Sequence, residues 1–200
     1  MPTLVLASQS PARLTTLRSA GVEPVVIVSG VDESRLDGLP PRELALGIAE
    51  MKCATVASRD DLPEGAVVLG CDSVLELEGK PLGKPGTARE AVERWQAMRG
   101  RSGVLVTGHA LTDTASGATV SRTAATTVHF APISDDEITA YVATGEPLHV
   151  AGAFTIDGLG GPFVASIEGD HHNVVGLSLP LVRVMLAELG HEWTDLWTSH

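Results

Sequence analysis

The stretch Val67-Val68-Leu69-Gly70-Cys71-Asp72 joins an apolar run, typical of a buried strand, to an acid directly behind it. A strand that ends in a carboxylate places that carboxylate at the edge of a sheet, where α/β proteins usually bind their ligands. Two lysines, Lys52 and Lys84, flank this stretch in the sequence. We therefore expect an α/β fold whose functional edge carries Asp72.

A second apolar strand, residues 4–6, runs into Ser8-Gln9-Ser10-Pro11-Ala12-Arg13. Pro11 suits the first position of a helix, and Ser10 suits its cap. A helix start exposes unpaired backbone N–H groups and the positive end of the helix dipole, and Arg13 adds a cation. The sequence thus predicts a phosphate-binding turn at Ser8 and Ser10.

Further along the chain, helical and strand patterns alternate. In the first half of the chain we expect a helix that ends at Gly21, a strand over 25–28 and a helix from Pro41 that carries Lys52 near its end. Strands over 66–70 and 74–77 follow, with a turn at Glu78-Gly79, and then a helix over 87–100. In the second half we expect two long antiparallel strands within 104–130, a helix from Ser134 to near Gly145, a strand over 163–167 and a final helix over 180–189. The pairs Thr87/Glu90 and Ser134/Glu137 predict reciprocal helix caps. No linker separates independent domains, so residues 1–200 are expected to form one domain of two lobes that share a mixed sheet.

Composition limits the partners. The formal net charge of −11 argues against a nucleic-acid polymer or an anionic membrane, because both require an extended basic face. A small phosphorylated ligand needs only a few cations and a divalent metal. Cys53 and Cys71 match no zinc or redox spacing, the apolar residues 4–7 are too short for a signal peptide, and no run spans a bilayer. We expect a reduced, cytoplasmic protein in which both cysteines are small apolar fillers.

Several segments look like known motifs but differ from them in spacing or in sequence context. Residues 79–84 have the wrong glycine spacing for a phosphate-binding P-loop, and residues 158–161 lack the dinucleotide-binding pattern. The adjacent His171 and His172 point apart and favour a surface or turn role over a zinc site. Ser8 and Ser10 lack the context of a catalytic nucleophile, which favours capping.

Taken singly, the candidate residues have ordinary explanations. Asp72 is more often a strand-end or turn residue than a catalyst, the two lysines are usually solvated, and Glu33 is usually a loop acid. Their combination with a serine-rich helix start favours a metal-bound polyphosphate.

The same residues carry a resemblance to a known family, the Maf-like nucleoside triphosphate pyrophosphatases. The matching motifs run in order along nearly the whole chain: residues 6–11 with Arg13, Val31-Asp32-Glu33-Ser34, Lys52, Gly70-Cys71-Asp72-Ser73, Leu82-Gly83-Lys84-Pro85, Gly145-Glu146-Pro147, Ala151-Gly152-Ala153-Phe154 and Val175-Gly176-Leu177. The resemblance implies a two-lobed α/β fold with a twisted mixed sheet and a central cleft, similar to inosine triphosphatases. It also implies a homodimer that hydrolyses nucleoside triphosphates to monophosphate and pyrophosphate, a sanitising role against non-standard nucleotides, and a link to cell-division arrest.

The chemistry of the residues and the family resemblance together assign roles at the site. We expect Asp72 to accept a proton from the attacking water and, with Glu33, to hold Mg²⁺ or Mn²⁺. Arg13, Lys52 and Lys84 would clamp phosphate oxygens, and Ser8 and Ser10 would complete the phosphate site. The resemblance alone places Ser73 and Asp157 at the nucleoside end.

The chain departs from the family pattern at several positions. Ala12 replaces a common arginine, Val150 a common lysine and Asp157 a common glutamine, while Gly70-Cys71-Asp72-Ser73 replaces Gly-Ala-Asp-Thr. The acids and lysines remain, so these changes concern base preference rather than chemistry. The alternative is a nucleotide-binding regulator of cell division without turnover, and the intact Asp72 argues against it.

Overall fold

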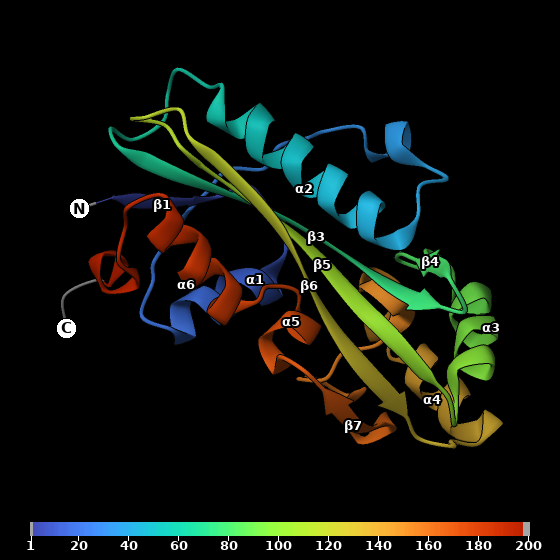
Figure 1. The fold of residues 1–200 in the computed structure, drawn as a ribbon. Coiled ribbons are helices and arrows are strands. Elements are labelled where there is room, and N and C mark those ends of the chain that lie inside the picture. The colour runs from blue at the N-terminus through green and yellow to red at the C-terminus, as the bar shows by residue number, and fades with distance from the viewer. Residues whose placement is uncertain (1, 198–200) are drawn as a thin grey trace.

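The computed structural model describes residues 2–197 as a seven-stranded mixed sheet with helices on both faces (Figure 1). The strand order is β2-β1-β3-β5-β6-β7, with β4 paired to β3. The strands are β1 (Thr3–Leu6), β2 (Val25–Val26), β3 (Ala66–Leu77), β4 (Lys80–Leu82), β5 (Ser102–Asp113), β6 (Thr119–Phe130) and β7 (Val164–Glu168). β1 is parallel to β2 and β3, and the other pairs are antiparallel, which confirms the predicted mixed α/β sheet.

Six α-helices and five short 3₁₀ helices connect these strands in the described part of the chain. The α-helices are α1 (Pro11–Ser19), α2 (Pro41–Ala57), α3 (Ala88–Met98), α4 (Asp135–Ala143), α5 (His171–Val175) and α6 (Leu179–Glu188). The 3₁₀ helices are η1 (Glu33–Leu36), η2 (Glu146–His149), η3 (Ala151–Ala153), η4 (Gly161–Phe163) and η5 (Trp193–Leu196). None of these helices combines the length and apolar character that a membrane crossing requires.

The strand that carries Asp72 does not end there. We expected two strands, over 66–70 and 74–77, but β3 continues from Ala66 to Leu77, and Asp72 pairs with Gly108 of β5 in its middle. The prediction of a strand-end carboxylate is therefore wrong. Asp72 and Ser73 have a low preference for strands, but ten consecutive residue pairs with β5 stabilise the strand through them.

Helix α2 covers one face of the sheet, and α1, α5 and α6 cover the other (Figure 1). α2 lies very close to the strands at Gly70 and Gly108, where any side chain would overlap the carbonyl oxygens of Ala49 and Ala45 in the helix. Glycine is the residue that allows such a close approach of two backbones.

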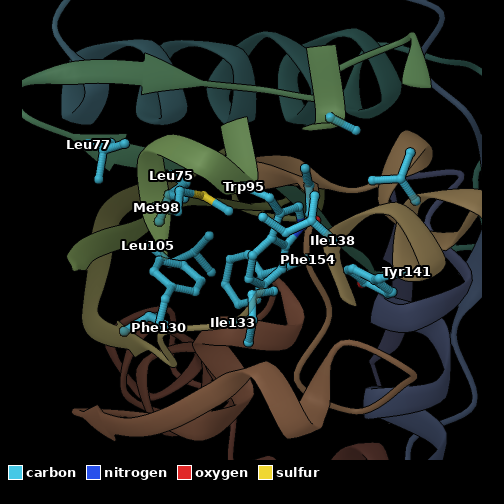
Figure 2. Close-up of a cluster of buried hydrophobic side chains, with 14 residues drawn as sticks. Leu75, Leu77, Trp95, Met98, Leu105, Phe130, Ile133, Ile138, Tyr141 and Phe154 are labelled. Carbon is cyan, nitrogen blue, oxygen red and sulfur yellow. The ribbon is translucent and has the colours of Figure 1, made fainter. Parts of the chain in front are cut away.

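A separate apolar cluster fills the end of the sheet next to α3 and α4 (Figure 2). The ring of Trp95 packs edge-on against Phe130 and Tyr141, with centroids 5.7 and 5.6 Å apart, and its Nε1 donates to the Ala153 carbonyl at 2.8 Å. These contacts attach η3 to the sheet.

Most predicted boundaries are confirmed, and the exceptions have local causes. Ser10 caps α1, Ser134 and Glu137 form a reciprocal capping box, and Gly21 and Gly145 end their helices with positive φ. Thr87 caps α3, but Glu90 bonds to Arg94 instead of returning to the cap. β2 is shorter than the predicted strand, and α5, which carries His171 and His172 on its exposed side, was not expected. Both cysteines are buried as predicted, and the division into two lobes stays a prediction.

Candidate active site

The candidate site lies at a gap in the sheet. The pairing of β1 with β3 ends at Leu69, and the pairing of β4 with β3 begins at Leu75. Among the described strands, residues 70–74 of β3 therefore pair with β5 alone. The gap lies beyond the carboxyl end of β1, where ligands bind in open sheets with parallel strands.

On the α2 side of the gap, one lysine joins two carboxylates. Lys52 Nζ donates to Asp72 Oδ1 at 2.8 Å and lies 2.7 Å from Glu33 Oε1. The side chains of Lys52 and Asp72 are 12% and 15% exposed, whereas Glu33 is 51% exposed. The structure thus brings together three sequence-predicted residues from α2, β3 and η1.

The same carboxylates suit a hard divalent cation. Both acidic oxygens lie within 2.8 Å of Lys52 Nζ, so the two carboxylates lie close to one another. Within residues 2–197, no group of three or more histidine, cysteine or acidic side chains could hold a metal by itself. Two carboxylates fit Mg²⁺ that completes its shell with water and substrate phosphates.

A small cavity of about 280 Å³ adjoins this cluster. It opens between the loop that leads into η1 and the flank of α2. Its lining includes Asp32 and Met51, the residues directly before Glu33 and Lys52, and also Ser29, Gly30, Val31, Arg35 and Thr55.

The opposite face of the gap holds a buried arginine. Arg13 donates from Nε to the Gly176 carbonyl at 2.7 Å, from one terminal nitrogen to Ser8 Oγ at 3.2 Å, and from the other to Ser73 Oγ at 3.0 Å. Ser73 continues the chain of hydroxyls to Thr107 Oγ1 at 2.9 Å. Arg13 therefore fastens α1 to β3 and to the turn before α6, and much of its donor capacity is already used.

The turn after β1 follows the predicted pattern. Ser8 Oγ accepts from the Ser10 backbone N–H at 3.1 Å, and Ser10 Oγ accepts from the Arg13 N–H at 3.4 Å. Ser8 is buried and Ser10 is half-buried. Ser10 caps α1, Ser8 holds the turn before it, and the start of α1 lies beside the gap.

On this face of the sheet, a neutral histidine of β5 bonds to the start of α6. His109 is fully buried, its Nδ1 lies 3.1 Å from the Thr107 carbonyl, and its Nε2 accepts from the Ser178 N–H at the start of α6 at 2.9 Å. Burial, and then the charge of Arg13, lower the pKa of His109 to about 4. Burial likewise raises the pKa of the Cys71 thiol to about 12, which leaves that thiol unreactive.

Lys84 does not join either cluster. Its side chain is exposed, and no described contact links it to Asp72. The preceding Gly83 carbonyl accepts from the Gly152 N–H at 3.1 Å and from Arg94. Gly152 in turn lies against Leu75 of β3. The loop of Lys84 is thus attached to η3 and, through it, to β3.

Asp157 also stays outside both clusters. It is exposed, and among residues 2–197 it takes part in no hydrogen bond or ion pair. Its loop is organised by Glu146, which the sequence did not single out as a functional residue. Partial burial raises the pKa of Glu146, but hydrogen bonds, led by that from Thr155, lower it below its usual value. The motif Gly145-Glu146-Pro147 was the available signal.

Comparisons with known proteins agree with this architecture. The family described as Maf-like protein matches residues 3–189. A Streptomyces coelicolor protein named nucleoside triphosphate pyrophosphatase is 61% identical over 194 residues, covering 97% of this chain and 94% of its own. Proteins of the same name from Streptomyces avermitilis and Salinispora tropica are 60% and 57% identical, each over 98% of this chain and over 94% and 87% of their own. The solved Staphylococcus aureus Ham1 protein shares the fold, with a TM-score of 0.52 and 15% identity over 94% of this chain and 99% of its own.

Proposed function

This chain belongs to the Maf-like protein family, and on that premise we propose that it hydrolyses nucleoside triphosphates to monophosphate and pyrophosphate, with a divalent cation and with Asp72 as general base. The activity itself, that of a hydrolase acting on acid anhydrides, rests on relatives that are 57–61% identical over nearly the whole chain. The assignments of the metal and of the general base rest on the geometry of the site, and the substrate range rests on the family resemblance.

One observation carries the proposal: Lys52 bridges Asp72 and Glu33 beside the gap in the sheet. Here a nearly buried lysine holds one nearly buried and one half-exposed acid around the same point. Such an arrangement suits a polyphosphate that arrives with its own cation.

Each residue then has a defined task. Asp72 keeps Oδ1 on Lys52, while Oδ2 accepts no hydrogen bond from the described residues and is free to take a proton from water. Lys52 orients that carboxylate and contacts phosphate oxygens. Lys84, which is exposed, adds a second cation for the leaving pyrophosphate. A divalent cation held by Glu33 and Asp72 would supply charge neutralisation of the triphosphate.

The substrate range is a further part of the proposal. Asp157, which the resemblance places at the nucleoside end, stands where a glutamine is common in the family, and Ala12 stands where an arginine is common. We include non-standard nucleotides among the substrates, and the protein is proposed to act as a homodimer in the cytoplasm.

The test is to incubate the purified protein with canonical and modified nucleoside triphosphates and Mg²⁺ or Mn²⁺ in ¹⁸O-water. Attack of water on the α phosphorus places the label in the monophosphate and releases unlabelled pyrophosphate. Inorganic phosphate as the first product would contradict the proposed cleavage. Binding without any turnover would favour the regulator instead.

A further inference from the structure

Glu146 is the centre of an unusually complete hydrogen-bond network. Its Oε1 accepts from Tyr141 Oη at 2.8 Å, from Thr155 Oγ1 at 2.5 Å and from the Gly160 N–H at 3.0 Å, while its Oε2 accepts from the Leu159 N–H at 3.0 Å. The donors come from α4 and from both ends of the turn 155–160. A single carboxylate therefore fixes the whole turn.

The backbone is wrapped closely around this carboxylate. A Cβ at Gly158 would lie 2.6 Å from Glu146 Oε2, and a Cβ at Gly160 would lie 2.5 Å from Tyr141 Oη. Neither position has room for a side chain. The ring of Tyr141 is itself packed against Trp95, 5.6 Å between centroids, in the apolar cluster (Figure 2). The turn is thus tied to the rigid core and not only to its own loop.

The fixed turn presents two unlike side chains to solvent. Asp157 is exposed, with no hydrogen-bond partner among residues 2–197, and Leu159 is 59% exposed, one of the few large apolar side chains on the surface of that part of the chain. A carboxylate accepts hydrogen bonds from ring and exocyclic N–H groups, and an apolar side chain covers one face of a flat ring. Together they fit a nucleobase and would repel a phosphate.

The turn follows directly on the segment that holds the Lys84 loop. Gly152 of η3 donates to the Gly83 carbonyl, next to Lys84, and lies against Leu75 of β3. The proposed phosphate contact and the exposed pair Asp157/Leu159 are therefore attached to the same short stretch of chain.

We propose that Glu146 is a positioning residue that holds the turn 155–160, so that Asp157 and Leu159 contact the base and Glu146 thereby sets base selectivity. The inference rests on the proposed function and deepens it. Holding the turn before the substrate arrives lowers the entropy lost on binding, and this advantage is greatest for a base that matches the fixed geometry.

The test compares Glu146→Gln with Glu137→Gln. Glu137 lies in α4, the helix that also carries Tyr141, and accepts two hydrogen bonds from Ser134. Its variant therefore makes the same charge change and weakens a helix cap without touching the turn 155–160. Two quantities are measured: amide hydrogen exchange at Leu159 and Gly160, and the affinities for the α,β-imido analogues of UTP and ATP. Neither readout requires turnover.

In Glu146→Gln we expect exchange at both amides to rise about tenfold or more, because the Gln side chain keeps a single, uncharged acceptor oxygen for four donors. The ratio of the two affinities should move toward one, by up to about tenfold, while Glu137→Gln keeps the wild-type ratio. Unchanged exchange, or faster exchange with an unchanged ratio, overturns the inference. If Glu146→Gln does not fold, Tyr141→Phe removes one donor and should shift both readouts in the same direction. A wild-type protein that binds neither analogue contradicts the proposed function instead.

Discussion

Asp72 and Ser73 are consecutive residues of β3, and their side chains reach cations on opposite faces of the sheet. Asp72 accepts from Lys52 beside α2, and Ser73 accepts from Arg13 beside α1. The alternation of a strand requires this separation. The two cations cannot be equivalent: Lys52 sits between acids near the surface, whereas Arg13 is buried among neutral acceptors.

Replacing Asp72 by Asn should abolish turnover and keep the fold. The amide oxygen can still accept from Lys52, and Lys52 keeps Glu33, so no buried charge loses its partner. Loss of a general base lowers kcat by roughly 10²- to 10⁴-fold. The checks are kcat, the melting temperature and the affinity for a non-hydrolysable analogue. Glu76→Gln, four residues on in the same strand, is the matched control, and near wild-type turnover in Asp72→Asn would remove the base assignment.

Replacing Glu33 by Gln should weaken the metal rather than the nucleotide. The variant removes one negative charge from a two-carboxylate site, and ligand charge sets the affinity for hard cations, so the half-saturating Mg²⁺ concentration should rise by roughly tenfold. Titration of metal at fixed nucleotide measures it. Asp32→Asn changes the neighbouring exposed acid, which bonds to Ser34, and serves as the control. A lower kcat at an unchanged metal requirement would instead make Glu33 an organiser of the site.

Replacing Arg13 by Lys should cost stability more than affinity. An ammonium cannot reach the three acceptors that the guanidinium holds at 2.7 to 3.2 Å, and the free energy of unfolding should fall by about 2 kcal/mol or more. Arg18→Lys, in the same helix but exposed, should change it by less than about 0.5 kcal/mol. Chemical denaturation measures both. Wild-type stability with a large rise in KM would show that Arg13 binds phosphate directly, as the sequence suggested.

His109 should make the fold sensitive to acid. Its pKa is about 4 in the folded protein against 6.5 for the free side chain, so the unfolded chain binds more protons between these values. Stability is then complete above about pH 6.5 and falls as the pH drops toward 4, by roughly 3 kcal/mol from this residue. His109→Gln keeps an acceptor for the Ser178 N–H and should flatten this decline. Denaturation at several pH values tests it, with the exposed His149→Gln as control; an unaltered slope would assign the acid sensitivity elsewhere.

Asp157→Gln should change which bases are preferred without changing stability. The substitution keeps size and polarity, removes the charge and adds donors, and the side chain has no bonds to lose among the described residues. The measurement is kcat/KM for a set of bases beside the melting temperature. Altered stability with constant selectivity ratios would mean that Asp157 serves only its own loop.

Local patterns were sufficient wherever a single segment determines its own structure. The helix start at Ser10 and Pro11, the capping box at Ser134 and the helix end at Gly145 all depend on neighbours within a few residues. The same reasoning failed at Asp72, because the strand is continued by β5, more than thirty residues away in the chain.

The site was predictable as a set of residues but not as a geometry. Lys52, Glu33 and Asp72 are joined as the sequence suggested, whereas Arg13 turned inward because Gly176 and Ser73 offer acceptors that no local pattern reveals. Glu146 was missed for a related reason. Its donors lie 5 to 14 residues away and two of them are backbone amides, which leave no trace in the sequence.

Gly70 and Gly108 set the distance between α2 and the strands at the site. They let α2 rest on the strands without intervening side chains, and only at that depth does the Lys52 ammonium meet Asp72. The distance between α2 and the strands therefore depends on the absence of a Cβ at these two positions. In a saturation mutagenesis selected for activity, these two positions should tolerate as little as the acid and the lysine they bring together, although neither carries a reactive group.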